Sequence, residues 1–109
     1  MFTKNETMNN DKGQGLMRKY VWVLETIHRH RKLSFKELNE LWLNDDDISM
    51  GVELPKRTFD NWRYAIWDIF GLDIVNEQRG KYRYYIENEA DITGNGLSSW
   101  LYSTLSIAN

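Results

Sequence analysis

The sequence predicts a mainly α-helical α+β domain with three helices, a β-hairpin and a short C-terminal helix. Two observations support this prediction. Between positions 16 and 70, apolar residues recur at three- and four-residue steps, which is the period of an amphipathic helix. Between positions 72 and 86 the period changes to two, as in paired β-strands. The length of 109 residues leaves room for one domain, which we place at residues 16–96.

We expect the first helix to cover residues 16–31 and to follow a flexible N-terminal arm, residues 1–15. The arm has only three large apolar side chains among many polar ones, which is too few for a packed element. The helix ends in a basic cluster from His28 to Lys32, which the helix macrodipole favours at a C-terminus. Its predicted apolar stripe consists of Leu16, Tyr20, Val23, Leu24 and Ile27.

A second helix is predicted to begin at Ser34 and to end near Leu43. Ser34 and Glu37 have the spacing of a capping box, in which each side chain bonds the other residue's backbone N–H. The connector 44–54 is longer than the turn of a simple helix-turn-helix, so it has room for an extra turn or a loop of its own, with Gly51 as the turn point. The apolar stripe of this helix consists of Phe35, Leu38, Leu41 and Trp42.

A third helix is expected between Pro55, which suits a first helical turn, and Gly71, which suits the residue after a helix end. Its apolar stripe consists of Phe59, Trp62, Ile66, Ile69 and Phe70. The opposite face carries Lys56, Arg57, Asp60, Asn61, Arg63, Tyr64 and Trp67. This helix therefore presents a polar and aromatic surface to its surroundings.

Residues 72–77 and 81–86 are predicted to be the strands of a β-hairpin whose short loop ends in Gly80. Strand alternation places Tyr82, Tyr84 and Ile86 on one face. After a polar connector, residues 97–109 form a short amphipathic segment. We expect this segment either to dock on its own domain or to pair with a second copy in a homodimer.

Three helices followed by a hairpin is the order of a winged helix-turn-helix, with the third helix in the DNA major groove and the hairpin as the wing, so double-stranded DNA is the expected partner. Arginine binds phosphates or guanine, asparagine pairs with adenine, and a helix start favours phosphate. Asp60 would repel phosphate unless it pairs with Arg57 or Arg63, or accepts a hydrogen bond from a cytosine amine. The candidate DNA contacts are Lys56, Arg57, Thr58, Asn61, Arg63 and Tyr64 on the helix, with Arg79 and Lys81 on the hairpin.

The formal net charge is −2, but the charge is unevenly distributed. From Lys56 to Arg83 there are six cations and four acids, whereas residues 86–109 contain three acids and no Lys or Arg. For nucleic-acid binding, the position of the cations matters more than their sum. The acidic total is therefore compatible with a DNA-binding face.

Three stretches carry a family resemblance: residues 18–43 (RKYVWVLETIHRHRKLSFKELNELWL), 54–74 (LPKRTFDNWRYAIWDIFGLDI) and 79–92 (RGKYRYYIENEADI). Together they resemble the N-terminal DNA-binding region of WYL-domain transcriptional regulators of Bacteroides-type bacteria, over about residues 18–109. The resemblance implies a winged helix whose DNA-contacting helix is matched by Arg57, Thr58, Asn61 and Arg63.

Two features depart from that family. Trp62 stands where we expect a histidine, which favours packing over base contact at this position. Regulators of this kind also carry a sensor domain after the winged helix, and nothing in the sequence corresponds to it. The chain therefore resembles a truncated regulator or a stand-alone first domain, in which residues 97–109 are the linker toward the absent sensor.

We expect no enzyme, metal or cofactor site. Cysteine is absent, which excludes disulfides and thiolate zinc sites, and no Gly-rich phosphate loop or nucleophile motif occurs. His28 and His30 are two residues apart on a helix, so they point to different sides. Asp45, Asp46 and Asp47 lack the ligand spacing of a calcium loop, so a solvated acidic loop is the simpler interpretation.

Two further expectations concern location and partners. No apolar run is long enough to cross a membrane and no apolar signal region is evident, so we expect a cytoplasmic protein without a membrane partner. The alternative function is a winged helix that binds protein instead of DNA. In that case Tyr64, Trp67 and Tyr85 are the candidate aromatic patch.

Overall fold

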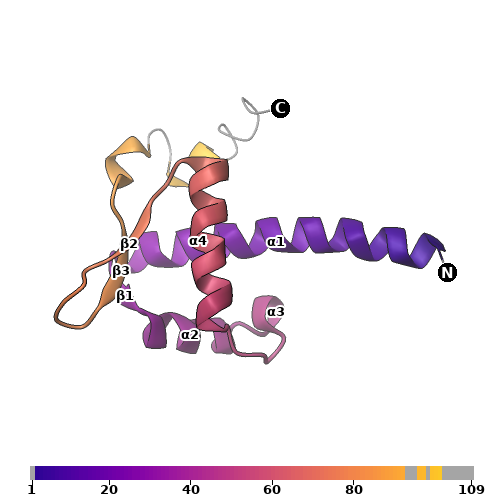
Figure 1. Cartoon of the computed structure of the whole chain (residues 1–109), viewed down its shortest axis with the longest axis horizontal. Helices are drawn as coiled ribbons and strands as arrows, with labels where there is room; N and C mark the ends of the chain where they lie inside the picture. The colour runs from indigo at the N-terminus through magenta and orange to yellow at the C-terminus, as the bar shows by residue number, and fades with distance from the viewer. Residues whose placement is uncertain (1, 93–95, 98, 102–109) are drawn as a thin grey trace.

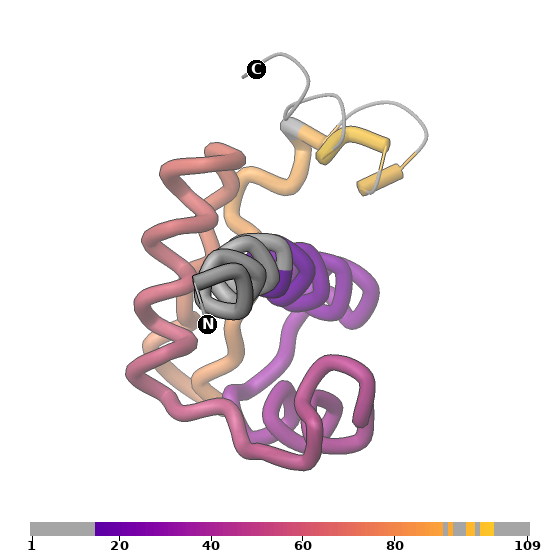
Figure 2. Tube along the Cα trace, turned by 90° about the vertical axis from the view of Figure 1, so that its right-hand side faces the viewer, coloured from indigo at the N-terminus to yellow at the C-terminus, as the bar shows by residue number. Residues whose placement is uncertain are grey.

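The computed structural model describes residues 2–92, 96–97 and 99–101. It is an α+β fold in which α4 crosses α1 and a small sheet lies beyond the C-terminal end of α1 (Figure 1). Viewed along α1, α4 lies on one side of it and the α2–α3 pair on another (Figure 2). The elements are α1 (Phe2–His30), β1 (Leu33–Ser34), α2 (Phe35–Asn44), α3 (Asp46–Ser49), α4 (Lys56–Phe70), β2 (Ile74–Asn76), β3 (Arg83–Ile86) and the 3₁₀ turn η1 (Glu89–Asp91).

The first helix begins at Phe2 and not at Leu16 as predicted, so the backbone of residues 2–15 is helical. Apolar spacing could not reveal this part of α1, because that spacing detects a packed face and not helicity itself. Each residue added to an existing helix gains one backbone hydrogen bond, so a helix can extend through a sequence that has no apolar stripe. Leu16 is also exposed, although it was expected in the apolar stripe, whereas Val23, Leu24 and Ile27 are fully buried.

The start of α2 confirms the predicted capping box. The Glu37 backbone N–H donates to Ser34 Oγ at 3.1 Å, and the Ser34 N–H donates to Glu37 Oε1 at 3.0 Å. These bonds from Ser34 lower the pKa of the Glu37 carboxyl below its ordinary value. The helix ends at Asn44, one residue later than predicted.

The connector between α2 and α4 does contain an extra helical turn, α3. The chain reverses after it at Met50 and Gly51, both of which have a positive φ, as expected for a turn at Gly51. Two side chains of α2 bind the last part of the connector, residues 52–54. The Trp42 indole N–H donates to the Val52 carbonyl at 2.7 Å, and the Leu54 N–H donates to Asn39 Oδ1 at 2.9 Å.

The bounds of α4 are close to those predicted. Pro55 is the N-cap residue, one position before the first turn, and its carbonyl accepts the first helical bond from Phe59. Gly71 ends the helix in the left-handed conformation that glycine adopts without strain. Ile69 is the one error in the predicted stripe, because it is exposed. The residues that α4 buries are Phe59, Trp62, Ile66 and Phe70.

The hairpin belongs to a three-stranded antiparallel sheet in the order β1-β3-β2. Strand β1 was not predicted, because two residues are too few to show a period, and it pairs Leu33 with Tyr84. Both hairpin strands are shorter than expected, with Ile74 opposite Ile86. Tyr84 and Ile86 share one face of β3, as predicted, and both are buried there. Tyr82, predicted on the same face, lies outside β3, has a positive φ and is exposed.

A single cluster of buried apolar residues joins α1, α2, α4 and the sheet. Leu97 and Leu101 belong to the same cluster, so this part of the C-terminal segment docks on its own domain, which was one of the two expected outcomes. The rest of that segment, residues 98 and 102–109, lies outside the described residues. No helix in the described ranges is both long and apolar enough to cross a membrane.

Candidate nucleic-acid interface

The outward surface of α4 consists of residues opposite its buried stripe. Arg57, Asn61 and Tyr64 follow one another at four- and three-residue steps, so they lie one above the other along the helix. We call these three residues the outward stripe. All three are exposed, Tyr64 to 75% of its surface. No hydrogen bond or ion pair joins their side chains to another described residue.

The neighbouring stripe of α4 carries Lys56, Asp60 and Arg63, and its charges are paired. Lys56 Nζ lies 2.8 Å from Asp60 Oδ2, and Arg63 Nη1 lies 3.0 Å from Asp60 Oδ1. Asp60 was expected to repel phosphate unless it paired with Arg57 or Arg63. In the structure it pairs with Arg63 and also with Lys56, which was not predicted. Burial raises its pKa, but the hydrogen bonds from Lys56 and Arg63 outweigh burial and hold the pKa below its ordinary value.

Arg63 is also bound to the sheet, so it is less available for DNA than its sequence position suggested. Its Nε donates to the Ile74 carbonyl at 2.9 Å, and its guanidinium lies 4.9 Å from the centre of the Tyr84 ring. Lys56 Nζ lies 5.6 Å from the centre of the same ring. The pKa of Lys56 is raised above its ordinary value, and the largest cause is its hydrogen bond to Asp60. Lys56 and Arg63, the two predicted DNA contacts on this stripe, therefore already have partners on the protein itself.

Thr58 lies away from the outward stripe. It is half-buried and lines a groove of about 470 Å³ between α1 and the α3–α4 connector, together with Arg18 and Lys19. Trp62, next to it in the groove wall, is buried and meets the Tyr20 ring edge-on at 6.1 Å between centroids. Packing is therefore the role of Trp62, as expected at the position where the family resemblance departs.

The hairpin tip, residues 77–82, exposes Arg79 and Lys81. Figure 1 shows this loop reaching away from the body, level with the N-terminal end of α4. Asn76 braces the loop: its Oδ1 accepts from the Gln78 N–H and its Nδ2 donates to the Tyr82 carbonyl, each at 2.8 Å. This role of Asn76 was not predicted from the sequence, although asparagine side chains commonly bond the backbone of turns.

Glu77, where the hairpin loop begins, holds two basic side chains in ion pairs. Glu77 lies 3.1 Å from Arg83 Nη2 and 3.3 Å from Lys32 Nζ. Hydrogen bonds from Arg83, and then from Lys32, lower the pKa of the Glu77 carboxyl to about 2. Lys32 also lies 5.1 Å from the centre of the Tyr85 ring, so this half-buried tyrosine is partly covered.

The basic end of α1 has structural partners. His28 Nδ1 and Arg31 Nη1 both contact the Glu89 carboxylate, which lies in η1. His30 Nδ1 lies 2.9 Å from the Thr26 carbonyl, so the two histidines have different partners. Within the described residues, no group of three or more His, Asp or Glu side chains could hold a metal ion.

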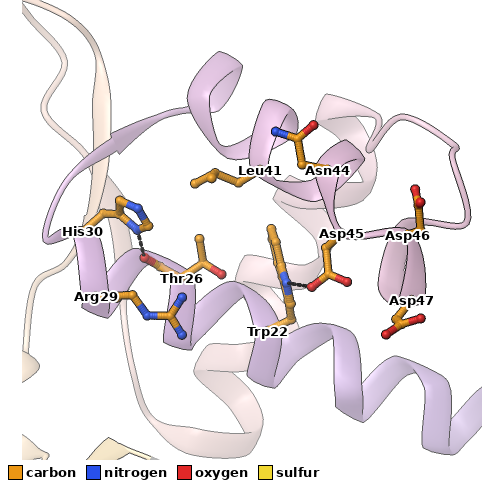
Figure 3. A pocket seen from close by; sticks show the side chains of 9 residues that line it. All are labelled: Trp22, Thr26, Arg29, His30, Leu41, Asn44, Asp45, Asp46 and Asp47. Carbon is orange, nitrogen blue, oxygen red and sulfur yellow. Dashed lines mark hydrogen bonds between the residues drawn. The ribbon is translucent and has the colours of Figure 1, made fainter.

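A second groove of about 460 Å³ lies between α1 and the junction of α2 with α3 (Figure 3). Arg29 and His30 are at one end, and the acidic run predicted to be a solvated loop is at the other. Asp45 is partly covered and accepts a hydrogen bond from the Trp22 indole at 3.0 Å. Asp46 and Asp47 are exposed in the first turn of α3, where acidic residues suit the positive end of a helix.

We compared the chain with protein-family models, with curated proteins and with solved structures, and none of them matches it.

Proposed function

We propose that this chain binds double-stranded DNA as the winged helix-turn-helix domain of a bacterial transcriptional regulator, the role that its resemblance to the first domain of WYL-domain regulators implies. In this proposal α4 enters the major groove and the hairpin tip contacts the backbone or the minor groove. As a regulator of bacterial genes it would work in the cytoplasm.

The observation that carries the proposal is that exposed cations on α4 and on the hairpin tip have no ion-pair partner among the described residues. The ion pairs in the described part of the chain engage Arg31, Lys32, Lys56, Arg63 and Arg83. The three candidate contacts Arg57, Arg79 and Lys81 are exposed, and no ion pair joins them to another described residue. Free cations on a helix and on a neighbouring hairpin suit the phosphates of one duplex. Asn61 lies next to Arg57 on the outward stripe, where it can pair with adenine.

The test is duplex binding measured by fluorescence anisotropy at low salt. We expect wild type to bind a random-sequence duplex, and the triple variant Arg57→Ala, Arg79→Ala, Lys81→Ala to lose that binding. Arg29→Ala is the control, since Arg29 is exposed but lines the groove between α1 and α3. Equal binding by the triple variant and wild type would contradict the proposal.

A protein-binding module is the second candidate, and one observation favours it. Tyr64 and Trp67 on α4 are exposed to 75% and 51% of their surfaces. Exposed aromatic residues are typical of protein interfaces. Absence of duplex binding by wild type at low salt would favour this function over DNA binding.

A further inference from the structure

Arg63 joins three parts of the molecule through one side chain. It begins on α4, its Nε donates to the backbone of β2 at Ile74, and its guanidinium lies over Tyr84 of β3. A third contact, to Asp60, fixes the guanidinium from its own helix. Its side chain is 28% exposed, so the group is held between the helix and the sheet and is not extended into solvent.

The strand that Arg63 bonds is an edge strand. In the order β1-β3-β2, strand β2 is at one end of the sheet, and among the described residues it pairs with β3 along one side only. The bond from Arg63 to the Ile74 carbonyl therefore adds a link from this strand to α4. A guanidinium suits such a site because it offers several donors in a fixed plane and stacks on aromatic rings, which a lysine ammonium cannot do in the same way.

The acceptors in this arrangement are shared with Lys56. Lys56 Nζ donates to the two carboxylate oxygens of Asp60, at 2.9 and 2.8 Å. The Tyr84 ring lies beneath both Lys56 and Arg63. Tyr84 is buried and meets the Phe59 ring edge-on at 5.0 Å between centroids. We call Lys56, Asp60, Arg63, Tyr84 and the Ile74 carbonyl the helix–hairpin clamp.

We propose that Arg63 is a positioning residue that fixes the hairpin relative to α4, so that the helix and the hairpin tip engage one DNA duplex together. The inference rests on the proposed function. Two binding elements held in the correct relative position lose less conformational freedom on binding than two independent ones. Without the clamp, Arg79 and Lys81 would contribute less to the affinity that Arg57 and Asn61 provide.

A double-mutant cycle tests this coupling. Binding to one duplex is measured for wild type, for Arg63→Met, for the pair Arg79→Ala and Lys81→Ala, and for all three changes combined. We expect the loss of affinity caused by the hairpin pair to be smaller in the Arg63→Met background by at least about threefold, because coupled residues are not additive. Equal losses in both backgrounds would overturn the proposal.

Two further variants separate positioning from direct contact. Arg63→Lys keeps a cation that could bind phosphate, so wild-type affinity in this variant would show a direct contact and overturn the clamp. Asp60→Asn removes one negative charge near the DNA, so charge alone predicts tighter binding. The clamp instead predicts that this variant, like Arg63→Met, weakens the coupling to the hairpin pair.

A readout that needs no DNA separates failure of the clamp from failure of the proposed function. In amide hydrogen exchange, Arg63→Met is expected to speed exchange at the Glu77 amide, which donates to the Arg83 carbonyl across the hairpin, and at the Tyr82 amide, which donates to the Arg79 carbonyl within the loop. Amides around Ile27 in α1 are expected to stay protected. Arg57→Met is the matched control on the same helix and should leave the hairpin unchanged. Unchanged exchange in Arg63→Met would overturn the clamp, whereas faster exchange without any wild-type DNA binding would overturn only the proposed function.

Discussion

The helix α4 carries two adjacent stripes that both contain predicted DNA contacts: the outward stripe of Arg57, Asn61 and Tyr64, and the neighbouring stripe of Lys56, Asp60 and Arg63. In the second stripe, Asp60 lies between two cations, and the sheet supplies an aromatic ring and a carbonyl. In the first, the central residue is the neutral Asn61 where the second has Asp60, and the side chains remain exposed. The comparison shows that the spacing of residues on a helix assigns them to a surface, but that the neighbouring elements decide which of them are free.

The largest expected effect comes from removing the core contact beneath both stripes. Phe59 is fully buried, with ring centroids 5.5 Å from Phe35 and 5.0 Å from Tyr84. Phe59→Ala should lower the free energy of unfolding by about 3–5 kcal/mol, because it leaves a cavity at this junction. Chemical denaturation measures the loss. A loss below about 1 kcal/mol would mean that the helix and sheet are not held together through this ring.

The next effect separates the outward stripe from the rest of the surface. Arg57→Ala should weaken duplex binding by about 1–3 kcal/mol, the range for one specific arginine contact. The same change should alter the free energy of unfolding by no more than about 0.5 kcal/mol, since Arg57 is exposed. Titration calorimetry with a duplex and thermal unfolding provide the two values. A stability loss as large as the binding loss would place Arg57 among the residues that hold the fold.

Acid should weaken the paired charges and leave the outward stripe unaffected. The folded-state pKa of Glu77 is about 2, below its ordinary value of 4.5, so its ion pairs stabilise the fold above pH 4.5. That contribution is lost progressively as the pH falls from 4.5 toward 2. Asp60 acts in the same direction, because its pKa is also lowered. Thermal unfolding at several pH values should show the loss, and Glu77→Gln should show a shallower dependence. An equally steep dependence in Glu77→Gln would contradict this assignment.

The smallest expected effect on stability is at Tyr64. Because 75% of its surface is exposed, Tyr64→Ala should change the free energy of unfolding by no more than about 0.5 kcal/mol. The variant then separates the two candidate functions cleanly, since the fold is intact. Pull-down with a protein partner should be impaired if the aromatic surface is a docking site, whereas duplex binding should be impaired if the outward stripe contacts DNA.

The sequence was sufficient for elements that local chemistry specifies. The capping box of Ser34 and the glycine at position 71 mark the start of α2 and the end of α4, because their roles depend on residues a few positions away. The helical turn α3 could be expected only as one of two outcomes, since a connector length does not specify a conformation. Strand β1 could not be predicted, because two residues gain their strand conformation only from pairing with β3.

In the candidate site, too, some features could be predicted from the sequence and others could not. Exposure of Arg57, Arg79 and Lys81 followed from their positions on a helix face and in a turn. The engagement of Arg63 could not be foreseen, because its partners Ile74 and Tyr84 come from other elements. The helical backbone of residues 2–15 could not be predicted either, because their polar sequence has no apolar stripe that would indicate a helix.

The salt dependence of duplex binding tests the central claim most directly, because it counts the phosphates that the protein neutralises. The logarithm of the wild-type affinity should fall linearly with the logarithm of salt concentration. The slope should become shallower by about 0.9 for each phosphate-contacting cation removed from the set Arg57, Arg79 and Lys81. Arg29→Ala should leave the slope unchanged. The account is contradicted if wild type does not bind a duplex at about 50 mM salt, or if Arg29→Ala and Arg79→Ala reduce the slope equally.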